Sequence, residues 1–127
     1  QVPTWESINH WVDFLHRDTP VFTGTEKIAQ RTQASLFYIK IKRVKRGYYT
    51  AHFEFFAEDA SKMAEFEPTN RYYELLEQDI KENPELWLWT HKRWKRTRAG
   101  YEKRERIREE GRKRLLRKKE EASLQNK

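Results

Sequence analysis

Histidine side chains are the first candidates for catalysis in this chain, because it has no cysteine to act as a nucleophile. His10 is followed three residues later by Asp13, and on a helix the two would be neighbours, most simply as a pair facing solvent. His52 lies next to Glu54 on the outer face of a predicted strand. His91 lies within a basic segment whose charges disfavour its protonation. The histidine spacing fits no metal site, so we predict neither a catalytic residue nor a metal site.

Other common catalytic and nucleotide-binding motifs are also absent from the sequence. None of the serines lies in a Gly-x-Ser-x-Gly turn, and the four glycines are too far apart for a phosphate-binding loop. Gly24 and Thr25, at the start of a predicted helix, offer free backbone N–H groups that can donate to an anion. Ordinary helix capping is the simpler explanation for these two residues.

The segment over residues 84–96 has the most unusual composition, since tryptophans alternate there with lysines and arginines. This pattern fits stacking on nucleic-acid bases with contacts to phosphates, or binding at a bilayer surface with basic groups toward anionic head groups. A third interpretation places Trp87 and Trp89 in the hydrophobic core and leaves only the basic residues exposed. A second basic cluster, over residues 40–46, is most simply a solvated turn.

Length and composition favour one small domain with a charged appendage. The chain has 127 residues, 37% of them charged, and a net charge of +7. Residues 1–90 carry 11 basic and 14 acidic groups, whereas residues 91–127 carry 16 and 6, so the basic excess lies in the last third. No run of about 18 apolar residues is present for a membrane span, and the lack of cysteine excludes a disulfide framework. The first residue is Gln1, so we expect the chain to be part of a longer protein.

Hydrophobic periodicity predicts the elements that carry these residues. A helix is expected over residues 5–16, because apolar residues recur there at helical spacing. A turn is expected over residues 18–20, since the proline disfavours helix in the residue before it. Thr25 is then expected to cap a short helix over residues 26–32.

Residues 36–56 are typical of a β-hairpin, because apolar and polar residues alternate on both sides of Gly47. Phe37, Ile39 and Ile41 belong to the face that we expect to be half-buried. This hairpin is the clearest structural signal in the chain.

Two further helices and a tail are predicted after the hairpin. Thr69 is expected to cap a helix that ends near residue 82, and a short helix follows over residues 85–93. Beyond Gly100 the sequence is almost wholly charged, which indicates a solvated helix or a disordered tail. The predicted fold class is therefore α/β, with a β-hairpin flanked by helices and a charged C-terminal tail.

Four segments carry a resemblance to a known family. They are residues 11–15, residues 19–29 (Thr-Pro-Val-Phe-Thr-Gly-Thr-Glu-Lys-Ile-Ala), the hairpin through residues 43–49 and, above all, residues 84–95 (Pro-Glu-Leu-Trp-Leu-Trp-Thr-His-Lys-Arg-Trp-Lys). In order and spacing they resemble the C-terminal part of the bacterial lipid A biosynthesis acyltransferases, the lauroyl/myristoyl transferase family. The resemblance covers residues 1–98, implies a glycerolipid-acyltransferase-like fold for them, and leaves residues 99–127 as a basic helical or disordered tail.

The resemblance implies transfer of a fatty acyl group from acyl carrier protein, or another acyl thioester donor, to a hydroxyl of a lipid A precursor. It implies no cofactor, and it places the protein at the cytoplasmic face of the inner membrane. In that family a histidine and an acidic residue five positions later act as the general base and its orienting partner. The residues five positions after the histidines here are Leu15, Val21, Ala57 and Arg96, so we expect a fragment without the catalytic pair.

Substrate contacts are expected on the basic and threonine-rich segments of the resemblance. Arg93 and Lys95 are the leading candidates for binding lipid phosphates, because guanidinium groups bind phosphate oxygens in pairs. Thr23, Gly24 and Thr25 are expected to line the pocket. The partners in this interpretation are the acyl donor, the lipid A precursor and the membrane surface, and no nucleic acid. The alternative is a small basic nucleic-acid-binding module that uses the tryptophan and arginine segment and the tail.

Overall fold

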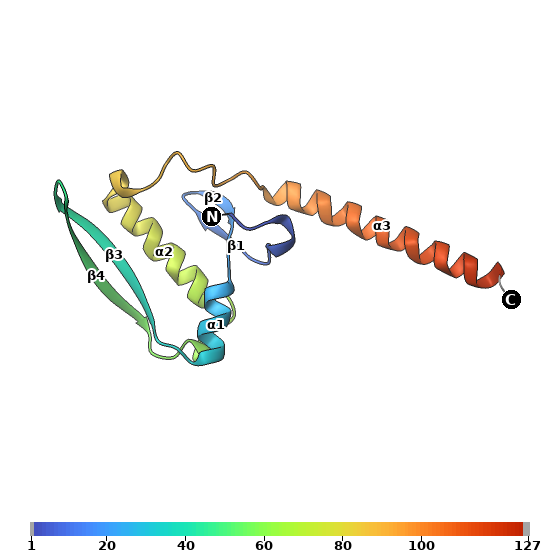
Figure 1. Ribbon diagram of the computed structural model, residues 1–127, viewed down its shortest axis with the longest axis horizontal. Helices are drawn as coiled ribbons and strands as arrows, with labels where there is room; N and C mark the ends of the chain where they lie inside the picture. Colours follow the sequence, from blue (N-terminus) through green and yellow to red (C-terminus); the bar gives the residue numbers. More distant parts are fainter. Residues whose placement is uncertain (1, 126–127) are drawn as a thin grey trace.

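The computed structural model describes residues 2–125 and has a mixed α/β architecture, as the sequence predicts. Within these residues, two separate two-stranded antiparallel sheets are combined with three α-helices (Figure 1). The elements are β1 (Trp11–Phe14), β2 (Arg17–Pro20), α1 (Gly24–Thr32), β3 (Leu36–Lys45), β4 (Tyr48–Ala57), α2 (Glu67–Glu82) and α3 (Arg98–Gln125). Single 3-10 turns, η1, η2 and η3, lie at Trp5–Ser7, Ala60–Lys62 and Pro84–Leu86.

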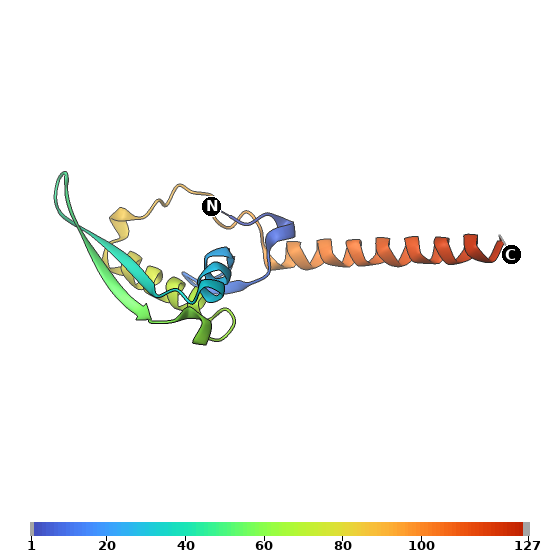
Figure 2. The same cartoon turned by 60° about the horizontal axis from the view of Figure 1, so that its bottom comes forward.

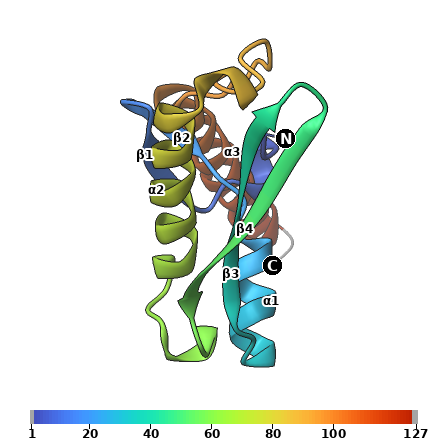
Figure 3. The same ribbon diagram turned by 90° about the vertical axis from the view of Figure 1, so that its left-hand side faces the viewer.

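Helix α2 lies between the two hairpins (Figures 1 and 3), and both β1 and β3 contact it. On the β1–β2 side, the buried residues Val12, Phe14 and Val21 pack with Ile80 of α2 to form the hydrophobic core. Partly buried residues pack around this core: Leu15, Tyr73, Leu76, Trp87 and Trp94. Burial of each of the four core side chains stabilises the fold by about 1.5–3 kcal/mol.

The helix predicted over residues 5–16 is wrong, because this segment forms η1 and then the first strand of a hairpin. Val12 and Phe14 are buried while Asp13 between them is exposed, which is the alternation of a strand. The same apolar residues also match a helical spacing over so few positions. Packing against α2 therefore decides between two patterns that the local sequence satisfies equally.

The β1–β2 turn consists of Leu15 and His16, which both have left-handed backbone conformations with φ of 51° and 60°. Such a two-residue turn is usually signalled by Asn-Gly or Asp-Gly, and neither is present here. The backbone N–H of Leu15 donates to Glu77 Oε2 of α2 over 3.1 Å, which anchors the turn. The turn predicted over residues 18–20 is also wrong, since this segment is part of β2.

The β3–β4 hairpin confirms the prediction over residues 36–56, with Gly47 in its turn at a φ of 79°. The expected buried face is wrong, however. Tyr38 faces α2 and is 5% exposed, whereas Phe37 and Ile39 on the opposite face are 54% and 52% exposed. The face of the hairpin that carries Tyr38 therefore packs on α2, and the apolar face that carries Phe37 and Ile39 remains exposed to solvent.

Helix α1 begins two residues earlier than predicted, with Thr23 instead of Thr25 as its N-cap residue. The Thr23 side chain does not cap the helix, because its hydroxyl pairs with the Asn9 amide, 2.9 Å from Nδ2 and 3.1 Å from Oδ1. Ala29 of α1 is buried, so the short helix packs through a small residue.

Glu26 of α1 binds the first turn of α2. Its carboxylate is in a residue only 4% exposed and accepts hydrogen bonds from the backbone N–H groups of Phe66 (2.7 Å) and Thr69 (3.2 Å), and from the Thr69 hydroxyl. Phe66 is the N-cap residue of α2, so the prediction of Thr69 as the cap is wrong. A carboxylate is stabilised here because the free N–H groups give a helix start a partial positive charge.

The helix predicted over residues 85–93 is limited to η3, and the chain then continues as turns toward α3. Trp87 packs edge-on against Phe14 with ring centroids 6.0 Å apart, and Trp94 Nε1 donates to the Thr19 hydroxyl over 2.8 Å. These contacts hold the segment across the core, so tertiary packing overrides its helical tendency.

Of the two alternatives for the tail, the structure has the helix, α3, which extends away from the rest of the protein (Figures 1 and 2). Its first residue, Arg98, makes a two-pronged ion pair with Asp18, at 2.6 and 3.0 Å. The Tyr101 ring lies edge-on to Trp11, 6.1 Å away. The start of α3 is therefore attached to the β1–β2 hairpin.

We predict that Glu26→Ala lowers the free energy of unfolding by about 2–4 kcal/mol, because two backbone N–H groups and a hydroxyl lose their acceptor in a buried site. Urea denaturation followed by circular dichroism measures the change. Glu65→Ala is the matched control, since Glu65 is exposed in the loop just before α2. An equal effect of the two substitutions would show that Glu26 does not cap α2.

Candidate functional site

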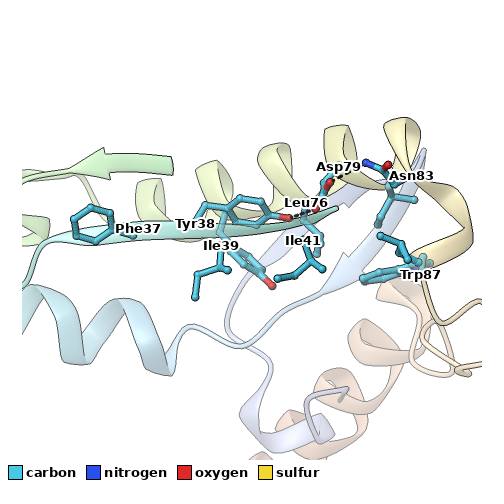
Figure 4. A pocket seen from close by; sticks show the side chains of 11 residues that line it. Phe37, Tyr38, Ile39, Ile41, Leu76, Asp79, Asn83 and Trp87 are labelled. Carbon is cyan, nitrogen blue, oxygen red and sulfur yellow. Dashed lines mark hydrogen bonds between the residues drawn. The ribbon is translucent and has the colours of Figure 1, made fainter. Parts of the chain in front are cut away.

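A groove lined by residues of both β3 and α2 is the candidate site (Figure 4). Its volume is about 430 Å³. Phe37, Ile39 and Ile41 line it from β3, and Leu76 lines it from α2, with Trp87 at the end of the groove beyond η3. Asp79 and Asn83 also line the groove, but most of the lining side chains are apolar, so the groove suits a hydrocarbon ligand better than a polar one.

A second hollow, of about 370 Å³, continues this groove toward α1. Phe37 and Tyr72 line both hollows, and the second one reaches Phe22 and Thr25 at the start of α1. The two hollows are therefore neighbours that share Phe37 and Tyr72 as walls, and we call them together the seam groove.

The hairpin is held to α2 by polar contacts at the side of the seam groove. The Tyr38 hydroxyl donates to Asp79 Oδ2 over 3.1 Å, and Lys40 Nζ lies 2.6 Å from Glu82 Oε2. Burial and the nearby Asp79 carboxylate raise the pKa of Tyr38 above its usual range. The hydrogen bond from Lys40 lowers the pKa of the Glu82 carboxyl. These pairs fix how closely the hairpin approaches α2.

Arginine side chains cover the faces of several tryptophan rings. Within residues 2–125, the pairs are Arg93 over Trp87, Arg17 over Trp94, Arg98 over Trp11, and both Arg96 and Arg104 over Trp5, with the guanidinium carbon 4.3–5.7 Å from the ring centroid. Each such contact contributes about 0.5–1 kcal/mol at an exposed position. The basic segment is therefore partly used to hold the fold together.

The two tryptophans of uncertain role differ in the structure. Trp87 packs on the core, as the third interpretation of the sequence required. Trp89 is exposed, and its Nε1 donates to the Pro84 carbonyl over 2.7 Å. The core interpretation is thus confirmed for Trp87 and wrong for Trp89.

The predicted substrate-binding residues occupy different places relative to the seam groove. Thr25 lines its α1 end, and Arg93 is stacked on Trp87 at its other end. Gly24 is exposed beside Thr25, whereas Thr23 is buried and pairs with Asn9. Lys95 is exposed and is not part of the groove lining. Of the five predicted residues, only Thr25 is therefore part of the groove lining, and Arg93 reaches the groove indirectly, through its contact with Trp87.

The histidines do not form a catalytic pair in the described residues. His10 stacks on Phe66 with ring centroids 4.1 Å apart, and its Nε2 lies 2.7 Å from Asn70 Oδ1, so the expected pairing with Asp13 is wrong. Burial lowers the pKa of His91, with a further contribution from Arg93, in the direction that the sequence predicted. Over residues 2–125 no three histidine or acidic side chains are grouped to hold a metal ion.

Sequence reasoning missed the apolar residues that line the seam groove. The alternation of Phe37, Ile39 and Ile41 predicts a half-buried strand face, but it does not indicate that this face lines a groove. On α2, Tyr72 and Leu76 recur at helical spacing and both line the groove. Two apolar faces that meet without filling the space between them cannot be recognised from either pattern alone.

Comparison with known proteins adds a family assignment. A family model described as bacterial lipid A biosynthesis acyltransferase matches residues 6–96. The chain belongs to this family. The match includes both hairpins, α2 and the tryptophan-rich segment, and it ends before α3. No curated protein and no solved structure matches the chain. In the described residues of this acyltransferase family member, the helices are too short or too polar to cross a bilayer.

We predict that Tyr38→Phe lowers the free energy of unfolding by about 1 kcal/mol, because Asp79 loses a buried hydrogen-bond donor. Tyr49→Phe, at an exposed position of β4, is the matched control and should change stability little. Urea denaturation at neutral pH measures both.

The same pair of variants tests the titration of Tyr38. The fold favours its neutral phenol, whereas an unfolded tyrosine ionises near pH 10. The free energy of unfolding should therefore fall as the pH rises above about 10, and it should fall less steeply in Tyr38→Phe than in Tyr49→Phe. Equal slopes would contradict the assignment.

Proposed function

We propose that this chain supplies the lipid-binding part of a lipid A biosynthesis acyltransferase. The reaction is transfer of a fatty acyl group from an acyl carrier protein thioester, or another acyl thioester, to a hydroxyl of a lipid A precursor. Residues 1–98 would form the C-terminal part of a glycerolipid-acyltransferase-like domain, and residues 99–127 a separate basic tail. The observation that carries the proposal is the apolar seam groove in a chain whose family transfers acyl groups.

The seam groove supports binding of a hydrocarbon chain. Its walls come from both a β-strand and a helix, so an acyl chain lying in it would contact apolar side chains on two sides. Each methylene group removed from water contributes about 0.8 kcal/mol, so a long acyl chain gains affinity with every carbon that enters. The exposed rings and branched side chains of Phe37, Ile39 and Tyr72 would lose water in the same step.

The ends of the seam groove support binding of polar groups. Arg93 is stacked on Trp87, which holds its planar guanidinium in place for phosphate oxygens of a lipid A precursor. Lys95, exposed two residues later, adds a second cation. Gly24 and Thr25 would line the opposite end, at the start of α1, and Thr23 would position them through its bond to Asn9.

We also propose that the protein acts at a membrane surface, on the cytoplasmic face of the inner membrane, because its lipid acceptor is located in a bilayer. Exposed Leu88 and Trp89 near Lys92 and Lys95 are consistent with such a surface.

The nucleic-acid alternative gains no support from the tryptophans. Base stacking requires open ring faces, yet arginines of this chain already lie over Trp5, Trp11, Trp87 and Trp94. The rings that the sequence offered for stacking are therefore largely occupied.

We predict that these 127 residues alone transfer no acyl group, because no histidine among them is followed five positions later by an acidic residue. The test mixes the purified chain with an acyl carrier protein thioester and a lipid A precursor, and detects the product by mass spectrometry. A family member that contains the histidine and acid pair serves as the positive control. Product formed by this chain would contradict the assignment of a binding role without catalysis.

We predict that Ile39→Glu weakens binding of a fluorescent fatty acid by about tenfold or more, because a carboxylate in the groove must lose its water when the chain binds. Ile107→Glu is the matched control, since Ile107 is 59% exposed on α3 and Ile39 is 52% exposed. Fluorescence titration of the full chain measures both dissociation constants. Equal losses would contradict the seam groove as the acyl site.

A companion substitution tests the phosphate end. Arg93→Gln should reduce binding to vesicles that contain a lipid A precursor, and it should leave fatty-acid binding nearly unchanged. Arg117→Gln, in the exposed tail, removes the same charge as a control.

A further inference from the structure

The tip of the β3–β4 hairpin projects from the fold without a partner. Residues 41–50 are all exposed, and the contacts of the hairpin with α2 are made before the tip, at Tyr38 and Lys40 (Figures 1 and 2). A free two-stranded ribbon is only marginally stable in water. We therefore expect the projecting tip to bind a partner.

The charge of the tip is entirely positive. Residues 27–53 contain no aspartate or glutamate, and four cations are gathered at the turn: Lys42, Arg43, Lys45 and Arg46. None of these four takes part in an ion pair within residues 2–125. This uncompensated charge distinguishes the tip from α3, where acidic residues are interspersed and pair with lysine and arginine, as in Lys113 with Glu109.

Apolar and aromatic side chains accompany these cations. Val44, Tyr48 and Tyr49 are 57–66% exposed, and Lys45 Nζ lies 4.4 Å from the centre of the Tyr48 ring. Tyrosine rings are enriched where a protein meets the head-group region of a bilayer, because one end of the ring is apolar and the other polar. A cluster of lysine and arginine beside them is attracted by anionic lipids.

We propose that the tip of the β3–β4 hairpin docks on the surface of an anionic lipid bilayer. The inference deepens the proposed function and depends on it, since it names a further surface, besides Leu88 and Trp89, through which the chain meets the membrane. The geometry connects the two sites: Ile41 adjoins the tip and also lines the seam groove. The apolar face of β3 thus runs from the bilayer surface into the groove, along the path that an acyl chain would follow.

The first test measures binding of the full chain to vesicles of phosphatidylglycerol and phosphatidylcholine that contain no lipid A precursor. Each lysine or arginine near an anionic surface changes the partition constant by about fivefold. Arg43→Gln combined with Arg46→Gln should therefore weaken binding by about 25-fold. The matched control, Arg114→Gln with Arg117→Gln on exposed α3, should change it by no more than about twofold. Reversal of this order would overturn the proposal.

The second test locates the tip relative to the bilayer. Because the chain has no cysteine, Val44→Cys gives a single site for an environment-sensitive fluorophore. Its emission should shift to shorter wavelength on phosphatidylglycerol vesicles and remain unchanged on pure phosphatidylcholine. The same label at Ser123→Cys, in the tail, should not shift. A shift at position 123 without one at position 44 would place α3 at the bilayer and overturn the proposal.

Two measurements separate this inference from its alternatives. Single-stranded RNA at equal phosphate concentration should compete poorly with vesicles, and tighter RNA binding that is lost in the double variant would make the tip a nucleic-acid surface instead. Fatty-acid binding should be unchanged in the double variant, because the seam groove is intact. Failure of the vesicle test with intact fatty-acid binding would therefore reject the docking surface alone, and the reverse result would reject the groove.

Discussion

The Glu26 carboxylate joins α1 to the first turn of α2, and the remaining structure depends on that contact. The carboxylate is almost fully buried, where it would be costly without partners, and the backbone N–H groups of Phe66 and Thr69 donate to it. Helix α2 in turn supports the core with β1–β2 on one side and the hairpin contact through Tyr38 on the other. A rotation or shift of α2 would therefore change the core packing and the width of the seam groove together.

The arginines in the segment after α2 stabilise the fold through contacts with tryptophan rings, in addition to any role in ligand binding. Arg96 and Arg98 lie over Trp5 and Trp11, which ties the start of α3 to the N-terminal segment. Arg93 is stacked on Trp87, but that ring also forms the end wall of the seam groove. The net charge of the segment thus overstates the number of cations available to a ligand, and the position of each guanidinium matters more than the count.

The sequence predicted an element correctly where one hydrophobic periodicity, that of a strand or that of a helix, continued long enough to exclude the other. The alternation over residues 36–56 excludes a helix, so the hairpin was predicted correctly. Over residues 11–14 both periods fit, and the turn at Leu15 lacks the usual glycine, so the first hairpin was missed. Glu26 was missed as a cap because its donors lie some 40 residues away. The seam groove was missed for the same physical reason: it arises from two elements that meet only in the folded chain.

The exposed face of the β3–β4 hairpin contributes both to the stability of the hairpin and to the seam groove. Phe37 and Phe55 are cross-strand partners with ring centroids 5.1 Å apart, so they stabilise the hairpin by contact with each other while both stay open to solvent. Covering these rings with a further helix would add burial, yet it would close the seam groove. The hairpin is instead held at its edge by the Tyr38 and Lys40 contacts, which leave the apolar face free. The apolar side chains of this face become buried only when a hydrocarbon ligand occupies the groove. Ligand binding should therefore stabilise this hairpin more than any other element.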